Sequence, residues 1–374
     1  MRKAGIAALA ALTGLAAGCQ FFQSEDEAAI SDEDLESVAA MLTEQSELTA
    51  QIAEAQERLI LDCVERQGHT VHDGYQSVMW GFGTLEDPIP DAGSVPWLTL
   101  DREEHAEWGF GVWTSTMDMY GSEEHLEFEE LSLPEGLESF ATVDNSEFEA
   151  LSDQERFDWY VAYYGRDRAV ADNGYLIGEF DVESDSVLIG TVEPGGCMGE
   201  VAEELGIEPE FEPAPDFGDD AGTWTTIPQA PGSEAVATGE LDERVVEERS
   251  GDREYLDCLE EAGWGRWEFN RRGSLEVWQF VDSAYGSDPV EELSDGLPEP
   301  PSDVPSGAEE RREWEIGLAG DMWDCVDRTG IDQEHHRAWK SVYGPHFLEF
   351  EEEAYAWQED MRDLIDRAQE MLGS

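Results

Sequence analysis

Two stretches of the chain carry apolar residues at helical spacing. Within residues 34–68, apolar side chains recur every three or four positions, which predicts a long helix with one apolar face. The later half of that helix presents Leu48, Ile52, Ala55, Leu59 and Cys63 on this face. The end of the chain carries a heptad stripe made of Phe350, Ala354, Trp357, Met361, Leu364, Ala368 and Met371. Because such a stripe needs a partner, we expect the helix 350–371 to pack on the protein's own helices, the one ending at Cys63 among them. Docking of another protein is the alternative.

Capping and turn residues predict the other elements. Ser152 and Glu155 form a capping box at the start of a helix, and helical patterns also occur at 101–108, 198–205, 240–262 and before Thr329. Residues 72–96 are rich in aromatic residues and glycine, which is typical of strands and turns, and alternation over 264–281 predicts a hairpin turning at 271–273. We therefore expect a mainly α (α+β) fold of helical units with small β hairpins.

The cysteines predict two disulfides. With Cys19 set aside, four remain, and Cys63, Cys258 and Cys325 each follow an aspartate and precede a glycine by five residues, as at the end of a helix. Four cysteines allow three pairings. We favour Cys63 with Cys197 and Cys258 with Cys325, because each pair then closes within one half of the chain. The sequence has no Cys-x-x-Cys and no zinc-type spacing, so a structural role is favoured over a redox or metal site.

The first nineteen residues indicate export. Arg2 and Lys3 precede a short apolar run over 4–17, which ends in small residues before Cys19 and resembles a bacterial lipoprotein signal peptide. Removal of residues 1–18 leaves Cys19 as the lipid-bearing N-terminus. We expect a lipid-anchored protein on the extracytoplasmic face of the cell membrane. The alternative is an ordinary secreted protein with a cysteine near its cleavage site.

Composition divides the remainder of the chain. Residues 19–33 read as an acidic tether, and residues 207–235 as a linker rich in proline, glycine and acid. This predicts a first disulfide-closed unit over 34–206 and a second over 236–374, which carries the C-terminal heptad helix.

The charge balance restricts the partners. The chain has 89 acidic and 21 basic residues, a formal net charge of −68, so it repels nucleic acid and anionic lipid. Its acidic runs could bind divalent cations weakly, but none has the oxygen spacing of a dedicated calcium loop. A hydrophobic content of 40% with 13 tryptophans argues for a packed core rather than a disordered acidic chain.

Several short motifs follow one another along the chain. In order they are Leu61-Asp62-Cys63 with Gly68, Trp108-Gly109-Phe110-Gly111, Leu151-Ser152 to Tyr163-Tyr164-Gly165, Gly195-Gly196-Cys197, and the Asp-Cys pairs at 257–258 and 324–325. This order resembles a group of secreted lipoproteins from high-GC Gram-positive bacteria. The resemblance implies exported, disulfide-linked helical units. Since that group has no assigned biochemical activity, it transfers no catalytic residue.

The sequence carries no recognisable catalytic signature. It lacks the phosphate-binding loop, the Gly-x-Ser-x-Gly elbow, His-Glu-x-x-His and the dinucleotide fingerprint. His69 and His72 beside Asp73, and the run 334–336 with His335 and His336, could supply metal ligands if the two halves met, but their spacing favours plain surface residues. We expect a non-enzymatic protein without cofactor or metal. A carboxylate-based hydrolase is a less favoured alternative.

The tryptophans offer a second functional interpretation. The tetrapeptide Trp-Gly-Phe-Gly occurs at 80–83 and again at 108–111, and Trp113 adds a ring nearby. Aromatic rings beside carboxylates can hold a glycan or a cation, so Trp80, Trp108 and Trp113 are candidate ligand-binding residues, while the interpretation we favour places these rings in a core. Our first hypothesis is a membrane-anchored accessory or interaction lipoprotein. The second is a binding module for envelope glycan or cationic ligands.

Overall fold

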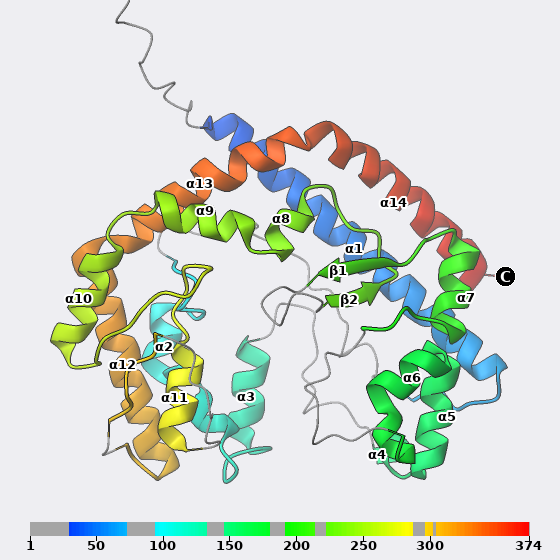
Figure 1. The fold of residues 1–374 in the computed structure, drawn as a ribbon, viewed down its shortest axis with the longest axis horizontal. Coiled ribbons are helices and arrows are strands. Elements are labelled where there is room, and N and C mark those ends of the chain that lie inside the picture. Colours follow the sequence, from blue (N-terminus) through cyan, green and yellow to red (C-terminus); the bar gives the residue numbers. More distant parts are fainter. Residues whose placement is uncertain are drawn as a thin grey trace, which may run out of the picture.

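The structure, a computed structural model, describes residues 30–72, 94–132, 146–179, 191–213, 222–286, 296–301 and 304–373. The predicted signal peptide, Cys19 and Trp80 lie outside these residues. The described chain is mainly helical and contains one two-stranded antiparallel hairpin, which confirms the predicted fold class. Its helices form an arch with a lobe at each end (Figure 1). None of the helices in the described ranges is long and apolar enough to cross a membrane.

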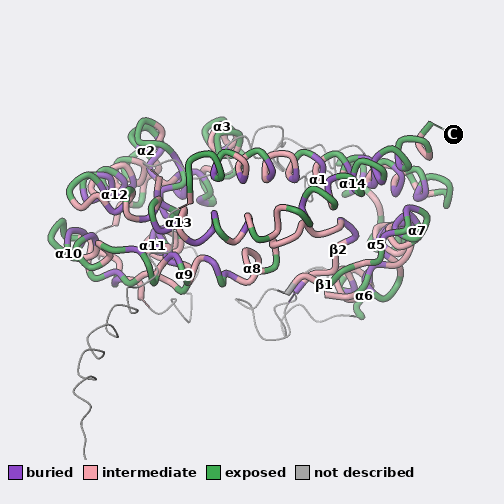
Figure 2. The backbone as a smooth tube through the Cα atoms, turned by 90° about the horizontal axis from the view of Figure 1, so that it is seen from above, coloured by how far each residue is buried: buried purple, intermediate pink, exposed green. Residues whose placement is uncertain are grey.

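The crown of the arch consists of three long helices, α1 (Asp32–Arg66), α13 (Ile331–Glu349) and α14 (Glu351–Leu372). α1 and α14 run parallel, since Ser37 bonds to Glu351, and the amide of Gln358 donates to the carbonyl of Met41 at 3.2 Å further along both helices. Seen from above, both helices alternate between buried and exposed positions along their length (Figure 2).

The two apolar stripes predicted from the sequence meet in this crown. Leu48, Ile52 and Leu59 of α1 share a core with Met361, Leu364 and Ala368 of α14. The expectation that the C-terminal helix packs on the helix ending at Cys63 is therefore confirmed. The stripe over 350–371 is largely covered by the chain itself.

The lobe that follows the end of α1, here called the α5 lobe, is built on aromatic residues. Phe157, Trp159, Tyr160 and Tyr163 pack against α1, and the predicted capping box of Ser152 and Glu155 opens the main helix. The disulfide Cys63–Cys197, with Cα atoms 5.7 Å apart, ties α1 to α7. The elements of this lobe are α4 (Ser146–Glu149), α5 (Asp153–Tyr164), α6 (Arg166–Asn173), the 3-10 helix η3 (Gly174–Ile177) and α7 (Gly196–Leu205).

The opposite lobe, here called the α12 lobe, is closed by the second predicted disulfide, Cys258–Cys325, with Cα atoms 5.8 Å apart. Its core gathers residues from distant parts of the chain, such as Trp97, Trp267, Phe280 and Met322. Both predicted pairings are thus confirmed. The elements are α2 (Arg102–Trp108), the 3-10 helix η1 (Val112–Ser115), α3 (Glu123–Ser132), α10 (Asp252–Ala262), α11 (Val277–Tyr285) and α12 (Ala308–Thr329).

A short segment beneath the crown connects the lobes. It holds the hairpin β1 (Glu210–Pro213) and β2 (Gly222–Thr225), in which Phe211 pairs with Trp224, followed by α8 (Ser233–Ala237) and α9 (Glu240–Glu248). The expected linker 207–235 therefore contains regular structure. The predicted sequence units also do not coincide with the spatial cores, because residues 95–113 pack in the α12 lobe and α14 packs on α1.

Two local predictions are corrected by the structure. The helix expected over 240–262 is two helices, α9 and α10, separated where Arg249 becomes extended and Gly251 adopts φ 92°. The hairpin expected over 264–281 is wrong: the turn at 271–273 exists, with Gly273 at φ 73°, but α11 follows it instead of a strand. Val277, Phe280 and Val281 lie on one helical face and fill the core, a spacing that outweighs the apparent alternation.

Candidate functional site

A cavity of about 250 Å³, open to the surface on one side, lies beneath the crown, where α1, α8, α13 and β1 meet. An apolar protein cavity of roughly 150 Å³ suffices for benzene, so this one has room for an aromatic ring or a branched aliphatic group. We call it the crown cavity. Its lining residues are Leu42, Gln45, Glu212, Ala230, Pro231, Ser233, Val236, Ala237 and Phe347.

A turn pinned to α13 shapes one wall of the crown cavity. Ser233 N donates to Ala230 O at 3.1 Å, and Gly232 between them has φ 84°. His346 Nε2 donates to Gly232 O at 2.9 Å, which holds the turn against α13. A Cβ on Gly232 would make a tight 3.1 Å contact with His346 Nε2, and this contact together with the positive φ favours glycine here.

The most buried polar residue of the cavity lining is Gln45. Gln45 is only 5% exposed, and its Nε2 has no hydrogen-bond partner. The buried glutamines elsewhere on α1 and on α14 have hydrogen-bond partners. Gln56 of α1 bonds to the backbone and hydroxyl of Thr226, and Gln358 of α14 bonds to Met41 O. Buried polar groups are nearly always paired, so this amide is an exception, but its nitrogen has almost no accessible surface and lies behind the cavity wall.

The lining also includes one charged residue, Glu212, which is half-buried as a whole, although the surface that lines the cavity is mainly apolar. Side chains alternate along β1, so Glu212 points away from the face on which Phe211 packs against Trp224. No ion pair or hydrogen bond to this carboxylate is found among the described residues. Of the basic groups nearby, His346 is bonded to Gly232 O, and Arg272 to Ala237 O at 2.9 Å.

The predicted ligand-binding tryptophans inside the described ranges are core residues. Trp108 is 7% and Trp113 3% exposed, and their rings stack with centroids 6.1 Å apart. The guanidinium of Arg312 lies 5.5 Å from the Trp108 ring centroid and 5.6 Å from that of Trp113. The structure therefore places both rings as the core interpretation expects, with little surface for a glycan to stack on.

The Trp-Gly-Phe-Gly motif at 108–111 forms a backbone pocket for a buried carboxylate. Glu315 of α12 is fully buried and accepts from Phe110 N at 3.0 Å, Val112 N at 3.2 Å and Trp113 N at 2.7 Å. A Cβ on Gly109 would lie 2.4 Å from Glu315 Cβ, so glycine is needed for this approach. Burial raises the pKa of Glu315 to about 7, although its hydrogen bonds oppose the rise.

The buried carboxylates with raised pKa do not form a catalytic pair. Burial also raises the pKa of Glu57, which accepts from the Tyr163 hydroxyl at 2.5 Å between α1 and α5. Glu57 thus belongs to the α5 lobe and Glu315 to the α12 lobe. Glycoside hydrolysis uses two carboxyl groups within roughly 5–10 Å of each other, an arrangement that these two residues do not provide.

The two pairs of histidines considered as metal ligands lie in different parts of the fold. His72 is buried and makes an edge contact with Phe148 in the α5 lobe, and Asp73 lies outside the described residues. His335 is on α13 and accepts a 3.3 Å hydrogen bond at Nδ1 from Arg249. Across the described part of the chain, no cluster of three or more His, Cys, Asp or Glu side chains is arranged to hold a metal ion.

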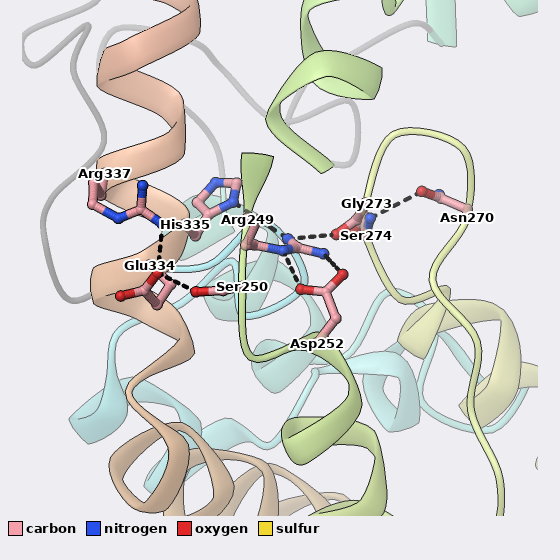
Figure 3. Close-up of polar contacts among 9 residues, drawn as sticks. All are labelled: Arg249, Ser250, Asp252, Asn270, Gly273, Ser274, Glu334, His335 and Arg337. Carbon is pink, nitrogen blue, oxygen red and sulfur yellow. Dashed lines mark hydrogen bonds and ion pairs between the residues drawn. The ribbon is translucent and has the colours of Figure 1, made fainter. Parts of the chain in front are cut away.

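His335 belongs to a structural network around a buried guanidinium (Figure 3). Arg249 bonds to both oxygens of Asp252, at 2.7 and 3.0 Å, and to Gly273 O at 3.0 Å, while the rings of Trp97 and Phe269 lie over it. Burial, with Arg249 adding repulsion, lowers the pKa of His335 to about 4. This network explains why the chain leaves the helical conformation between α9 and α10.

Sequence reasoning did not find the residues of the crown cavity. One signal was available, because Met41, Gln45 and Leu48 follow the helical stripe of α1 and place a polar residue at a core position. Glu212 and the turn at 230–233 carry no comparable local signal.

Comparison with family models, curated proteins and solved structures finds no match to this chain.

Proposed function

We propose that this protein is a non-enzymatic binding protein of the extracytoplasmic face of the cell membrane, anchored by a lipid on Cys19, that holds a ligand or partner by a small apolar group placed in the crown cavity. The observation that carries the proposal is the mainly apolar surface that Leu42, Val236 and Phe347 give to the cavity, with the unpartnered Gln45 Nε2 buried behind it. Leaving a buried amide unpaired costs about 1–3 kcal/mol, and a leucine would fit the stripe of α1 better. A guest that accepts a hydrogen bond would satisfy this amide after a movement of the Gln45 side chain toward the cavity.

The proposed location on the extracytoplasmic face of the membrane is supported by the sequence and agrees with the disulfides. Arg2, Lys3 and the apolar run before Cys19 resemble a lipoprotein signal peptide. Two disulfides between helices are typical of proteins that fold outside the reducing cytosol. The Cys19→Ala variant is expected to move from the membrane fraction to the medium, and labelled palmitate to be incorporated only into the wild type. Retention of this variant in membranes would contradict the anchor.

Among binding functions, the crown cavity favours an apolar group over a glycan. Sugar hydroxyls need several polar partners, whereas Leu42, Val236 and Phe347 supply most of the contact surface here. The heptad stripe had suggested docking of a partner protein. Because α1 covers most of that stripe, we assign the proposed binding to the crown cavity instead.

Benzyl alcohol is a suitable first probe, since its ring matches the cavity and its hydroxyl oxygen would accept from Gln45 Nε2 once that side chain moves toward the cavity. We expect the full chain to bind it with a Kd on the order of millimolar, as observed by NMR titration. Val236→Phe fills the cavity and should abolish binding. Gln45→Leu should weaken binding about three- to tenfold while raising the melting temperature, because the unpaired amide is removed.

The matched control is Gln51→Leu, at an exposed position of the same helix, which should change neither affinity nor melting temperature. Benzyl alcohol binding that is the same in wild type and Val236→Phe would refute the crown cavity as the site. A Gln45→Leu protein that is less stable than wild type would show that the amide has a structural role.

A further inference from the structure

We propose that Glu315 is a reversible proton-binding site inside the α12 lobe, and that the Tyr285 hydroxyl adapts to its two charge states by changing acceptor from the carboxylate to the backbone carbonyl of Arg311. The pH of the medium thereby decides whether the loop at 110–113 is held by a charged or a neutral acceptor. This inference does not depend on binding in the crown cavity.

The first step of the argument is the balance of forces on the Glu315 carboxylate. Its complete burial favours the neutral acid. Four donors favour the ionised form: Oε2 accepts from the backbone N–H groups of Phe110 and Val112. Oε1 accepts from Trp113 N at 2.7 Å and from the Tyr285 hydroxyl at 2.6 Å. Because these effects oppose each other, the pKa of Glu315 is raised only to about 7, and both charge states are populated near neutral pH.

The second step is that neighbouring cations are committed elsewhere. Arg311 and Arg312 lie one turn before Glu315 on α12, but the first guanidinium lies 4.6 Å from the Tyr285 ring centroid and the second lies over two tryptophan rings. Both form their ion pairs with other carboxylates. Burial lowers the pKa of His105 on α2, so this histidine is neutral near pH 7. The titratable and charged groups on the surrounding elements are His105 and Glu107 of α2, Asp118 after η1, His125 and Glu129 of α3, Asp282 of α11, and Arg311 and Arg312 of α12.

The third step is a second acceptor for the Tyr285 hydroxyl. Its oxygen lies 2.6 Å from Glu315 Oε1 and 3.4 Å from Arg311 O. When Oε1 takes up a proton from solvent, the new O–H donates to the Tyr285 oxygen, and the Tyr285 hydroxyl turns its own hydrogen toward Arg311 O. Tyr285 keeps its proton in both states, because burial raises the pKa of its hydroxyl. Each charge state therefore leaves the hydroxyl hydrogens with an acceptor.

Carbon-13 NMR of the full chain, labelled at the glutamate carboxyl and tyrosine Cζ carbons, tests this inference. We expect the Glu315 carboxyl signal to titrate with a midpoint at about pH 7, against about 4.3 for an ordinary glutamate. The Cζ signal of Tyr285 should move with the same midpoint. Glu315→Gln should remove the carboxyl titration and make the Tyr285 signal independent of pH in this range. The variant also distinguishes Glu315 from Glu57, whose pKa is raised by burial in the α5 lobe.

Tyr285→Phe identifies both signals independently if Glu315→Gln does not fold, because it removes the Tyr285 signal and shifts the carboxyl signal of its hydrogen-bond partner. Glu313→Gln is the matched control, at an exposed position of the same helix, and should leave both titrations unchanged. A midpoint for Glu315 below about pH 5.5 would overturn the proton-binding site. A Tyr285 signal that stays constant while Glu315 titrates would overturn the change of acceptor.

Discussion

The Tyr285 hydroxyl donates a 2.6 Å hydrogen bond to Glu315 Oε1, joining α11 to α12. The same carboxylate accepts three backbone N–H groups from the loop after α2, so one buried side chain holds three separate segments of the α12 lobe together. These segments come from positions 110–113, 285 and 315 of the chain. The contact accounts for the Trp-Gly-Phe-Gly motif at 108–111 as a structural element.

Replacement of Glu315 should therefore destabilise the fold. Glu315→Ala leaves three backbone N–H groups without an acceptor and the Tyr285 hydroxyl with only the long 3.4 Å contact to Arg311 O, and we expect the free energy of unfolding to fall by about 3 kcal/mol or more. Urea denaturation followed by circular dichroism measures this change. Glu313→Ala, at an exposed position of the same helix, should cost less than about 0.5 kcal/mol. Equal effects of the two variants would contradict the role of Glu315.

Glycine at position 111 is predicted to be required for packing as well as for backbone conformation. Gly111 and Gly121 both have positive φ, 70° and 76°, but a Cβ on Gly111 would lie 1.9 Å from Phe128 Cζ, whereas one on Gly121 would meet nothing within 4 Å. Gly121→Ala should cost about 1–2 kcal/mol for its backbone. Gly111→Ala should cost about 1–3 kcal/mol more, measured by the same denaturation. The prediction fails if the two alanine variants are equally stable.

Arg249 should not tolerate lysine. Its guanidinium is fully buried and bonds to Asp252, Gly273 O and His335 at once, a geometry that one ammonium group cannot reproduce. We expect Arg249→Lys to lower the free energy of unfolding by about 2–3 kcal/mol. Arg253→Lys serves as the comparison, because the Arg253 side chain is 89% exposed and its ion pair with Asp257 is surface-screened, so a change within about 0.5 kcal/mol is expected. A stable Arg249→Lys protein would refute the importance of the forked contact.

The lowered pKa of His335 predicts a pH-dependent contribution to stability. The unfolded chain takes up a proton on this histidine near pH 6.5, whereas the folded protein resists until about pH 4. Folding is therefore opposed increasingly as the pH falls from 6.5 to 4. His335→Gln removes this term while keeping an acceptor for Arg249, so at pH 4.5 the variant should gain about 2–3 kcal/mol on the wild type relative to their difference at pH 7.

Comparing the two proteins at each pH cancels contributions that they share. Glu315 is one of these, since its raised pKa stabilises the folded state as the pH falls below about 7. The neighbouring charged groups Glu334, Arg337 and His336 are also present in both proteins. A stability difference that stays constant between pH 7 and pH 4.5 would contradict the effect assigned to His335.

Local pattern was sufficient for the elements whose stability depends on nearby residues. The stripe ending at Cys63, the capping box of Ser152 and the C-terminal heptads follow from spacing along the chain, and the structure confirms them. It also confirms the disulfide pairing that we favoured among three because each bridge closes within one half of the chain. Helical periodicity and capping involve residues within a few positions of one another, so they can be read without a fold.

The order of residues thus determines the mainly helical class and the positions of most helices, whereas the division into cores and the candidate site depend on tertiary contacts. Residues 95–113 join the α12 lobe because Glu315 accepts their backbone N–H groups from about 200 positions away. Arg249 interrupts the expected helix over 240–262 because its partners lie on other segments. The crown cavity brings Gln45 to Glu212 and Phe347. The spacing of residues along the chain does not predict that these three residues line one cavity, since burial and pairing of polar groups are properties of the assembled molecule.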